Sequence, residues 1–408
     1  MENKVILMLG TFDSKGREFA YLHGELLRRG AAVLTMNTGV LGATDLFPID
    51  IPAEQVAQRG GVPLETLRRN GDRGEAMAVM CAGARALCKE LQEAGRIQGV
   101  IGMGGGGGTS IATTAMQALP VGFPKVCVTT LASGDTSAYV GSKDILLFPS
   151  IVDISGINRF SRLILSRAAG AVCGMTQVDP IPRQSDLPIV MLSMFGNTTA
   201  CVEECARLLQ GEGYDSLVFH ATGSGGRAME ELIREGVAVA ALDITTTEWA
   251  DELCGGALSA GPHRLEAPGQ AGIPHVIVPG CLDMVNFGAL DTVPQRYREA
   301  GRKLYQWNPL VTLMRTNEEE SAELGRILAE KANASPAPVA FLLPEGGLSI
   351  LDAPGQRFWD PQADRALFEA IRRHAKADIP IVKADENIND PAFARRAVGL
   401  LMEIIPHS

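Results

Sequence analysis

Five consecutive glycines, Gly104–Gly108, follow the apolar segment GVIGM and precede TSIATTAMQAL, which has helical character. The backbone N–H groups of such a run can approach an anion closely, and a helix start adds unpaired donors and the positive end of the dipole. The run therefore indicates a phosphate site. No lysine follows it, so it is not G-x-x-x-x-G-K-[ST]. A flexible turn is the alternative, although ordering five glycines carries an entropic cost that a turn does not require.

A lysine and an acidic residue lie in a second loop that could meet the glycine run. The segment GTFDSKG, residues 10–16, follows the first predicted strand and precedes a helix, so it should reach the same edge of the sheet. Lys15 could then balance phosphate charge. Asp13 or Ser14 could instead cap the helix.

Arg73 supplies a third candidate contact to phosphate. It follows Asp72 in the first turn of a predicted helix, where an arginine opposes the helix dipole unless an anion is bound nearby. Mg²⁺ could accompany the nucleotide through Asp13 or Asp135, because this ion needs only one or two carboxylates in addition to phosphate oxygens.

Reactive side chains also gather at predicted strand ends in the second half. The loop at residues 222–226 opens a helix and has the form of an anion site, so the neighbouring carboxylates, histidines and arginines suggest a small anionic substrate. Capping is the alternative for several of these residues. The candidate substrate-binding residues are Asn197, Thr198, Ser224, Gly225, Gly226, Arg227 and Arg264, and the candidates for handling protons are Asp243, Glu248, His263 and Asp283.

Short aliphatic runs alternate with amphipathic stretches throughout, which predicts βαβ units and mostly parallel sheets. The predicted strands of the first half are 5–9, 32–36, 99–103, 125–130 and 145–148, and its helices are 16–29, 72–94, 109–119 and 157–175. In the second half the predicted strands are 189–194, 216–220, 237–242, 275–278, 311–314, 339–343 and 379–382, and the helices are 198–210, 227–235, 318–331, 362–374 and 391–404.

The proline-rich segment 179–188 is predicted to link an N-terminal domain, residues 1–182, to a C-terminal domain, residues 187–408. Segments 6–39 and 189–223 can be laid over each other with a small gap. We therefore expect an α/β protein with two Rossmann-like open parallel-sheet domains in tandem, and ligands at the carboxyl ends of both sheets in an interdomain cleft. A wholly divergent second domain is the alternative.

Composition disfavours several classes of partner. The net charge is -10 with scattered basic residues, which offers no field for nucleic acid or an acidic membrane. The apolar run near the first residue is too short for a signal peptide or a membrane span, so we expect a cytoplasmic protein. The eight cysteines form no CxxC pair and no metal motif has ligand spacing, so the cysteines are expected in the core.

The motifs GTFDSKG, DRGEAM and GMGGGGGTS, followed by FGNTT, GSGGRAME, LDITTTE, PGCLDMVNFG and LDAPGQRFWDP, resemble the ATP-binding family of the tomato mosaic virus resistance protein and its bacterial homologues. The resemblance covers essentially the whole chain. It implies two α/β domains, ATP in the N-terminal one, and a homodimer. The ATP contacts that it implies are Asp13, Ser14, Lys15, Thr38, Arg73, Gly104, Gly105, Gly106, Gly107, Gly108 and Thr109.

These observations favour an ATP-dependent enzyme that acts on a small anionic metabolite, with Lys15 and Arg73 stabilising phosphate charge. The alternative is a nucleotide-gated regulatory or binding protein that does not turn over ATP. A nicotinamide-dependent oxidoreductase ranks last, because the glycines follow the wrong strand. A serine hydrolase is not expected, because G-x-S-x-G is absent.

Overall fold

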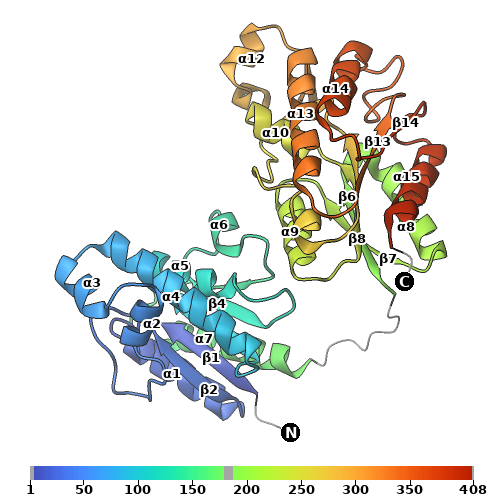
Figure 1. Ribbon diagram of the computed structural model, residues 1–408. Coiled ribbons are helices and arrows are strands. Elements are labelled where there is room, and N and C mark those ends of the chain that lie inside the picture. The colour runs from blue at the N-terminus through green and yellow to red at the C-terminus, as the bar shows by residue number, and fades with distance from the viewer. Residues whose placement is uncertain (1–3, 179–186, 407–408) are drawn as a thin grey trace. The chain divides into compact units, whose positions relative to one another are not determined.

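The computed structural model describes residues 4–178 and 187–406. The chain divides into two compact α/β units, residues 1–184 and 185–408 (Figure 1). Residues 179–186 of the expected linker lie outside the described residues. Among the helices of the described ranges, none combines the length and the apolar character needed to cross a bilayer.

A five-stranded parallel sheet with strand order β2-β1-β3-β4-β5 forms the centre of the N-terminal unit. Its strands are β1 (Val5–Gly10), β2 (Ala32–Asn37), β3 (Gly99–Gly104), β4 (Lys125–Thr129) and β5 (Leu146–Pro149). Its helices are α1 (Gly16–Arg28), α2 (Ala53–Arg59), α3 (Leu64–Asn70), α4 (Arg73–Glu93), α5 (Gly106–Met116), α6 (Ser137–Val140) and α7 (Arg159–Gln177). The predicted strands are confirmed, whereas α2, α3 and α6 were not predicted.

Helices cover both faces of this sheet, as the continuous burial of its central strands β3 and β4 requires (Figure 1). Along β1, Ile6 and Met8 pack in the cluster that contains α1 and α7. Leu7 and Leu9 point the other way and pack in the cluster that contains α2, α4 and α5. The period of two along the strand therefore places one apolar layer on each face.

A six-stranded parallel sheet with strand order β14-β13-β9-β8-β6-β7 forms the centre of the C-terminal unit. Its strands are β6 (Ile189–Met194), β7 (Asp215–His220), β8 (Ala240–Thr245), β9 (His275–Gly280), β13 (Val339–Pro344) and β14 (Ile381–Ala384). The helices are α8 (Thr199–Gly211), α9 (Ser224–Arg234), α10 (Glu248–Cys254), α11 (Ala267–Ala271), α12 (Gln295–Glu299), α13 (Glu318–Ala334), α14 (Pro361–His374) and α15 (Pro391–Ile404). Tandem α/β domains with parallel sheets are thus confirmed.

An antiparallel sheet in the C-terminal unit was not predicted. It has the strand order β10-β12-β11, with β10 (Met284–Phe287), β11 (Leu304–Asn308) and β12 (Val311–Arg315). The predicted strand 311–314 is confirmed as β12, but it pairs antiparallel with β10 and β11 and lies outside the parallel sheet. β11 was not predicted because it is a largely exposed edge strand with polar residues, and β10 was not predicted because it is only four residues long and follows β9 after a short turn.

Several boundaries also differ from the prediction, and two of these differences bear on the candidate sites. Helix α5 begins at Gly106, three residues before the predicted start, so the glycines themselves form its first turn. Strand β8 begins at Ala240 and continues to Thr245, whereas 237–242 was predicted. The buried Asp243 interrupts the apolar run, so the residues of this strand that follow Leu242 were not predicted.

The position of α4 depends on a close contact with α2. A Cβ atom on Gly83 would lie 1.9 Å from the carbonyl oxygen of Val56. Because this oxygen belongs to the backbone, the steric clash can be removed only if the backbone of α2 or α4 shifts. We expect Gly83→Ala to lower the free energy of unfolding of the N-terminal unit by about 1–3 kcal/mol.

Thermal unfolding can be followed by circular dichroism and tryptophan fluorescence together, because Trp249, Trp307 and Trp359 all lie in the C-terminal unit. We expect Gly83→Ala to lower the melting temperature of the transition that circular dichroism detects and tryptophan fluorescence does not, which is the unfolding of the N-terminal unit. Gly174→Ala is the control, since a Cβ there meets nothing within 4 Å. Equal transitions in both variants would contradict the prediction.

Candidate functional site

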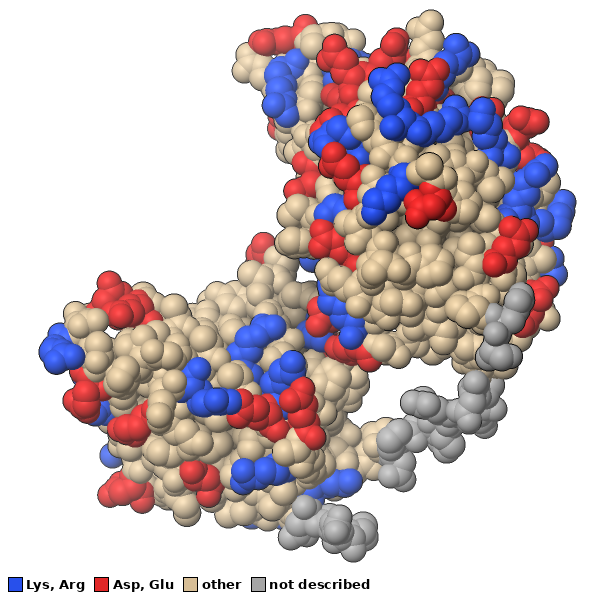
Figure 2. Space-filling model, viewed as in Figure 1, with Lys and Arg blue, Asp and Glu red and all other residues tan. Residues whose placement is uncertain are grey.

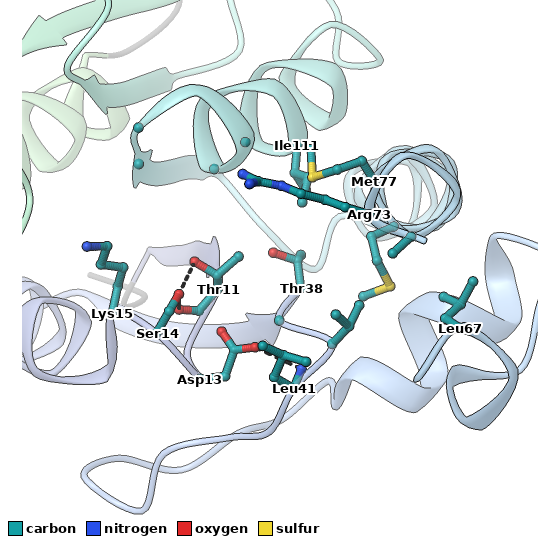
Figure 3. A pocket seen from close by; sticks show the side chains of 18 of the residues that line it. Thr11, Asp13, Ser14, Lys15, Thr38, Leu41, Leu67, Arg73, Met77 and Ile111 are labelled. Carbon is teal, nitrogen blue, oxygen red and sulfur yellow. Dashed lines mark hydrogen bonds between the residues drawn. The ribbon is translucent and has the colours of Figure 1, made fainter. Parts of the chain in front are cut away.

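A cavity of about 550 Å³ opens in the N-terminal unit at the carboxyl ends of β1, β2 and β3 (Figure 3). Because β2 and β3 lie on opposite sides of β1, this is the point at which the strand order reverses, where open α/β sheets bind ligands. The residues that line it are Thr11, Asp13, Ser14, Lys15, Thr38, Gly39, Val40, Leu41, Leu67, Arg68, Gly71, Asp72, Arg73, Ala76, Met77, Met80, Gly104, Gly105, Gly106, Gly107, Gly108 and Ile111.

The glycine run forms one wall of this cavity and presents open backbone donors. The first hydrogen bond inside α5 runs from the Thr109 amide to the Gly105 carbonyl at 2.9 Å, so the amides of Gly106–Gly108 precede the helix ladder. A Cβ on Gly104 would lie 2.6 Å from the Cα of Gly108, so glycine is required there for the loop to close. The wall has the donors and the close approach that a phosphate group needs.

Arg73 extends over this wall from the first turn of α4 (Figure 3). Its Nη2 atom lies 3.8 Å from the position that a Cβ on Gly107 would take. Among the described residues Arg73 makes no hydrogen bond or ion pair. An anion in the cavity would therefore find a guanidinium group that no protein carboxylate already holds.

Lys15 also lines the cavity and is already hydrogen-bonded. Its Nζ donates to the carbonyl oxygen of Ile154, in the loop that follows β5. Nearby, the Ser14 hydroxyl donates to the hydroxyl of Thr11 at 3.2 Å, and the Asp13 Oδ2 accepts from the amide of Leu41 at 2.9 Å. The loop after β1 is thus tied to the loops after β2 and β5.

Thr38 presents a buried hydroxyl without a partner. It follows β2, its amide donates to the Gly10 carbonyl at 2.8 Å, and it is 2% exposed. Its Oγ1 atom has no hydrogen-bond partner among the described residues, although the residue lines the cavity (Figure 3). A buried polar group of this kind costs about 1–3 kcal/mol unless something satisfies it.

The other end of the cavity is apolar. Leu67 from α3 and Met80 from α4 line it, and Met77 from α4 and Ile111 from α5 lie beside Arg73, nearer the glycine wall (Figure 3). Sequence reasoning missed these residues because their apolar side chains look like ordinary core positions of helices. The partial exposure of Met77 on an otherwise buried face is visible only once the helices are packed.

Two residues of the predicted nucleotide and magnesium sites lie apart from the cavity lining. The Thr109 hydroxyl is buried, donates to the Gly104 carbonyl at 3.1 Å and lies 2.7 Å from the Thr129 hydroxyl. Asp135 is exposed and accepts from the amide of Ser137 at 2.9 Å. The described ranges contain no cluster of three or more His, Cys, Asp or Glu residues suited to a metal ion.

In the C-terminal unit, the predicted Asp243, Glu248 and Arg264 come together as a buried ion-pair cluster. Arg264 Nε donates to Glu248 at 2.8 Å, and its other nitrogens pair with Asp243 and with Glu230. His275 Nε2 lies 2.8 Å from Asp243. Burial alone would raise the pKa of Asp243, but the Arg264 guanidinium and His275 outweigh it and hold that pKa below its usual range.

The loop that has the form of an anion site is occupied by a carboxylate of the protein itself. Glu248 Oε1 accepts from the amide of Gly223 at 2.7 Å and from that of Gly226 at 3.1 Å. A Cβ on Gly226 would lie 2.2 Å from this carboxylate, so only glycine fits. Glu248 thus occupies the backbone amides that the sequence analysis assigned to an anionic substrate.

The remaining predicted residues of this unit are dispersed. Ser224 and Arg227 are exposed, and the Arg227 guanidinium donates to the Ser259 carbonyl at 3.0 Å. His263 is exposed and lies 3.1 Å from Glu266. The Thr198 hydroxyl lies 2.7 Å from that of Thr245, and Asn197 donates to the sulfur of Met284 at 3.3 Å; Gly225 packs against the backbone of His220.

Asp283 belongs to a separate buried cluster with Asp352, Asp364 and a single arginine, Arg315. Asp283 accepts from the Ser349 hydroxyl at 2.8 Å, and Arg315 pairs with Asp364 at 2.6 Å. Burial and the neighbouring Asp352 raise the pKa of Asp283 to about 7 and that of Asp364 to about 8. Three carboxyl groups share one guanidinium, so protonation relieves their repulsion.

The chain matches a protein family along almost its whole length. Residues 4–180 match the N-terminal domain, and residues 187–405 the C-terminal domain, of the family described as Uncharacterised protein family (UPF0261). A UPF0261 protein of Clostridium tetani is 47% identical over 393 residues, 96% of either chain. A UPF0261 protein of Mesorhizobium japonicum is 44% identical over 406 residues, 99% of this chain and 100% of that protein. The ToMV resistance protein Tm-1(GCR237) of Solanum lycopersicum is 37% identical over 427 residues, 99% of this chain but 56% of the tomato protein.

The carboxyl cluster predicts that the C-terminal unit loses stability as the pH rises. Because the pKa values of Asp283 and Asp364 are raised, the folded unit still holds protons that the unfolded chain releases near pH 4. The stabilisation that these two protonated groups provide is therefore complete below pH 4, and it is lost as the pH rises through about 7 to 8. We expect the free energy of unfolding to fall from pH 5 to pH 8, by up to about 1.4 kcal/mol per pH unit for each proton.

Urea unfolding followed by tryptophan fluorescence between pH 5 and 8 measures this slope for the C-terminal unit. Asp283→Asn removes one of the two ionisable groups with little change in shape, so the slope should become shallower, and Asp364 should account for what remains. Asp291→Asn, at an exposed position, is the control. The same slope in Asp283→Asn and the unaltered protein would show that the cluster does not hold the proton.

Proposed function

We propose that this chain, which belongs to the uncharacterised protein family UPF0261, binds ATP in the cavity of its N-terminal unit. The observation that carries the proposal is the buried hydroxyl of Thr38, which lines the cavity and has no partner among the described residues. A ligand oxygen would satisfy it. The two chemically different ends of the cavity support the choice of a nucleotide.

The polar end suits the phosphates. It combines the open amides of Gly106–Gly108 with the guanidinium of Arg73, which has no carboxylate partner in the described ranges. Lys15 lines the same cavity and could exchange the Ile154 carbonyl for a phosphate oxygen. Backbone donors, a bidentate cation and a point charge together match a polyphosphate.

The apolar end suits the base. Leu67 and Met80 offer an apolar surface, and methionine adapts its shape to a flat ring. A cavity of about 550 Å³ lies within the range of about 300–1,000 Å³ that small-molecule sites occupy. A lone phosphate or sulfate would leave this end empty, so a nucleotide fits better than an inorganic anion.

Asp13 is the carboxylate that we propose for Mg²⁺. Asp13 and Asp72 both line the cavity, whereas Asp135 is exposed outside the lining. Asp72 Oδ1 caps α4 by accepting from the Glu75 amide at 2.8 Å, and Asp13 uses only Oδ2 to accept from the Leu41 amide, which leaves its Oδ1 for the ion. One carboxylate plus phosphate oxygens and waters meets the needs of this ion. The metal would therefore be held mainly by the nucleotide.

We favour binding without turnover over an ATP-dependent enzyme. The specific observation is that Asp243 and Glu248, the best candidates for handling protons in the C-terminal unit, are fully committed to buried ion pairs and backbone donors. ADP release by the purified chain with Mg²⁺ and a panel of small anionic metabolites decides between the two. Turnover that is lost in Lys15→Ala would favour the enzyme.

Thr38→Val should change affinity and stability in opposite directions. Valine has nearly the same shape and removes the unpartnered hydroxyl, so the free protein should be as stable or more stable. Loss of one hydrogen bond to ATP, about 1 kcal/mol, should raise the Kd for ATP about fivefold to tenfold by isothermal titration calorimetry.

Thr113→Val is the matched control. Its hydroxyl is also buried but donates to the Thr109 carbonyl at 2.8 Å and does not line the cavity. This variant should lose some stability and keep its affinity for ATP. Unchanged affinity in Thr38→Val would contradict the proposed contact, and no measurable ATP binding by the unaltered chain would refute the proposal itself.

Gly107→Ala tests whether phosphate lies against the glycine wall. The added methyl group would lie 3.5 Å from the sulfur of Met77 and 3.8 Å from Arg73, an ordinary contact that the fold tolerates. It enters the space that the phosphates need, so we expect the Kd for ATP to rise about tenfold or more with little change in melting temperature. Gly174→Ala, a surface helical glycine, should leave the Kd unchanged; equal affinities of the two variants would argue against phosphate at this wall.

A further inference from the structure

A second cavity, of about 390 Å³, lies at the carboxyl ends of β4 and β5 in the N-terminal unit. The residues that line it are Thr129, Thr130, Ala132, Ser133, Pro149, Ser150, Ile151, Val152 and Asp153. We propose that this cavity binds a small neutral molecule rich in hydroxyl groups, such as a sugar or polyol, beside the phosphate end of the nucleotide. The inference rests on the proposed function, whose failure the experiment below can separate from its own.

Residues that line the two cavities contact each other at the glycine wall. The amide of Thr130, in the second cavity, contacts the carbonyl of Gly104, in the first, at 3.4 Å. A Cβ on Gly105 would lie 3.8 Å from the Thr130 hydroxyl. Because β3 and β4 are neighbours in the sheet, with Gly104 opposite Thr129, a ligand in each cavity would lie on either side of the same loop.

A second link runs through Lys15. This residue lines the nucleotide cavity, and its Nζ donates to the carbonyl of Ile154, the residue that follows Asp153. Glu18, in the first turn of α1, accepts from the amide of Gly156. The loop that walls the second cavity is thus bonded to Lys15, which precedes α1 and lines the nucleotide cavity, and to Glu18 within α1.

The lining determines the class of ligand. Four of the nine lining residues carry hydroxyls, one is a carboxylate and none is basic. The hydroxyls of Thr130 and Ser133 and the carboxylate of Asp153 make no hydrogen bond or ion pair with any described residue. Free hydroxyls and a free carboxylate accept hydrogen bonds from hydroxyl groups, whereas an anion would meet Asp153 with no lining cation to offset the repulsion.

Backbone strain at the mouth of the cavity supports a functional role. Ile151 has a φ of 63°, which is a left-handed conformation that β-branched residues rarely adopt, and the residue is 77% exposed. Two hydrogen bonds between Ser150 and Val152, from the amide of Val152 and from the hydroxyl of Ser150, hold the turn closed. Strain that the surrounding bonds enforce is typical of ligand sites.

Saturation-transfer difference NMR on the full chain, with saturating ATP and Mg²⁺, tests the proposal. The neutral probes are glycerol, D-ribose and D-glucose, and the charged probes are citrate and putrescine. At least one neutral probe should bind saturably and should bind about tenfold more weakly to a Thr130→Val, Ser133→Ala double variant. The Ser155→Ala variant, at an exposed serine of the same loop outside the lining, should bind like the unaltered chain.

Several results would overturn the proposal. These are saturable binding of citrate or putrescine without any neutral probe, binding that the double variant does not weaken, or no saturable binding of any probe while calorimetry reports normal ATP binding. Absence of ATP binding in the same calorimetry would instead count against the nucleotide site. If the double variant fails to fold, the single variant Ser133→Ala, at an exposed loop position, replaces it.

Discussion

The backbone N–H groups at the start of α5 are the constraint around which the N-terminal unit is arranged. A helix start leaves its first amides without partners, and here no side chain of the described residues caps them. Because glycine has no side chain, these amides stay accessible to a ligand, and β3 places them at the carboxyl edge of the sheet. Helix α4 positions Arg73 next to them. Each neighbouring feature, including the partnerless Thr38, makes physical sense once an anion with further oxygens is placed there.

In the C-terminal unit, the open amides at the start of a helix are satisfied by a carboxylate of the protein itself. Glu248 accepts from two amides of the glycine loop at the start of α9, and Arg264 compensates its charge. One arginine cannot neutralise three buried carboxylates, so backbone amides stabilise the remaining negative charge. The amides of Leu265 and Ala267 donate to Glu230 at 2.8 Å each. Two units of the same fold class thus treat their glycine loops differently, one with an internal carboxylate and one with none.

The predictable part of the site is the part that local sequence encodes. A strand followed by glycines and a helix brings Gly104–Gly108 to the sheet edge, and the same reasoning brought Lys15 there from β1. The apolar end could not be predicted, because Leu67 and Met80 come together only through the packing of α3 and α4. In the C-terminal unit, residue type alone could not separate a reactive carboxylate from Asp243, whose partner lies 21 residues away in the chain.

This difference between the units has a thermodynamic consequence. A ligand that binds only the folded N-terminal unit would stabilise that unit by RT ln(1 + [L]/Kd), about 2.7 kcal/mol at a hundredfold excess over Kd. Glu248 gives the C-terminal unit the corresponding stabilisation permanently, because its carboxylate is covalently part of the chain. The stability of the N-terminal unit would then follow the nucleotide concentration, whereas that of the C-terminal unit would follow pH through Asp283 and Asp364. One chain would carry two similar folds whose stabilities answer to different chemical signals.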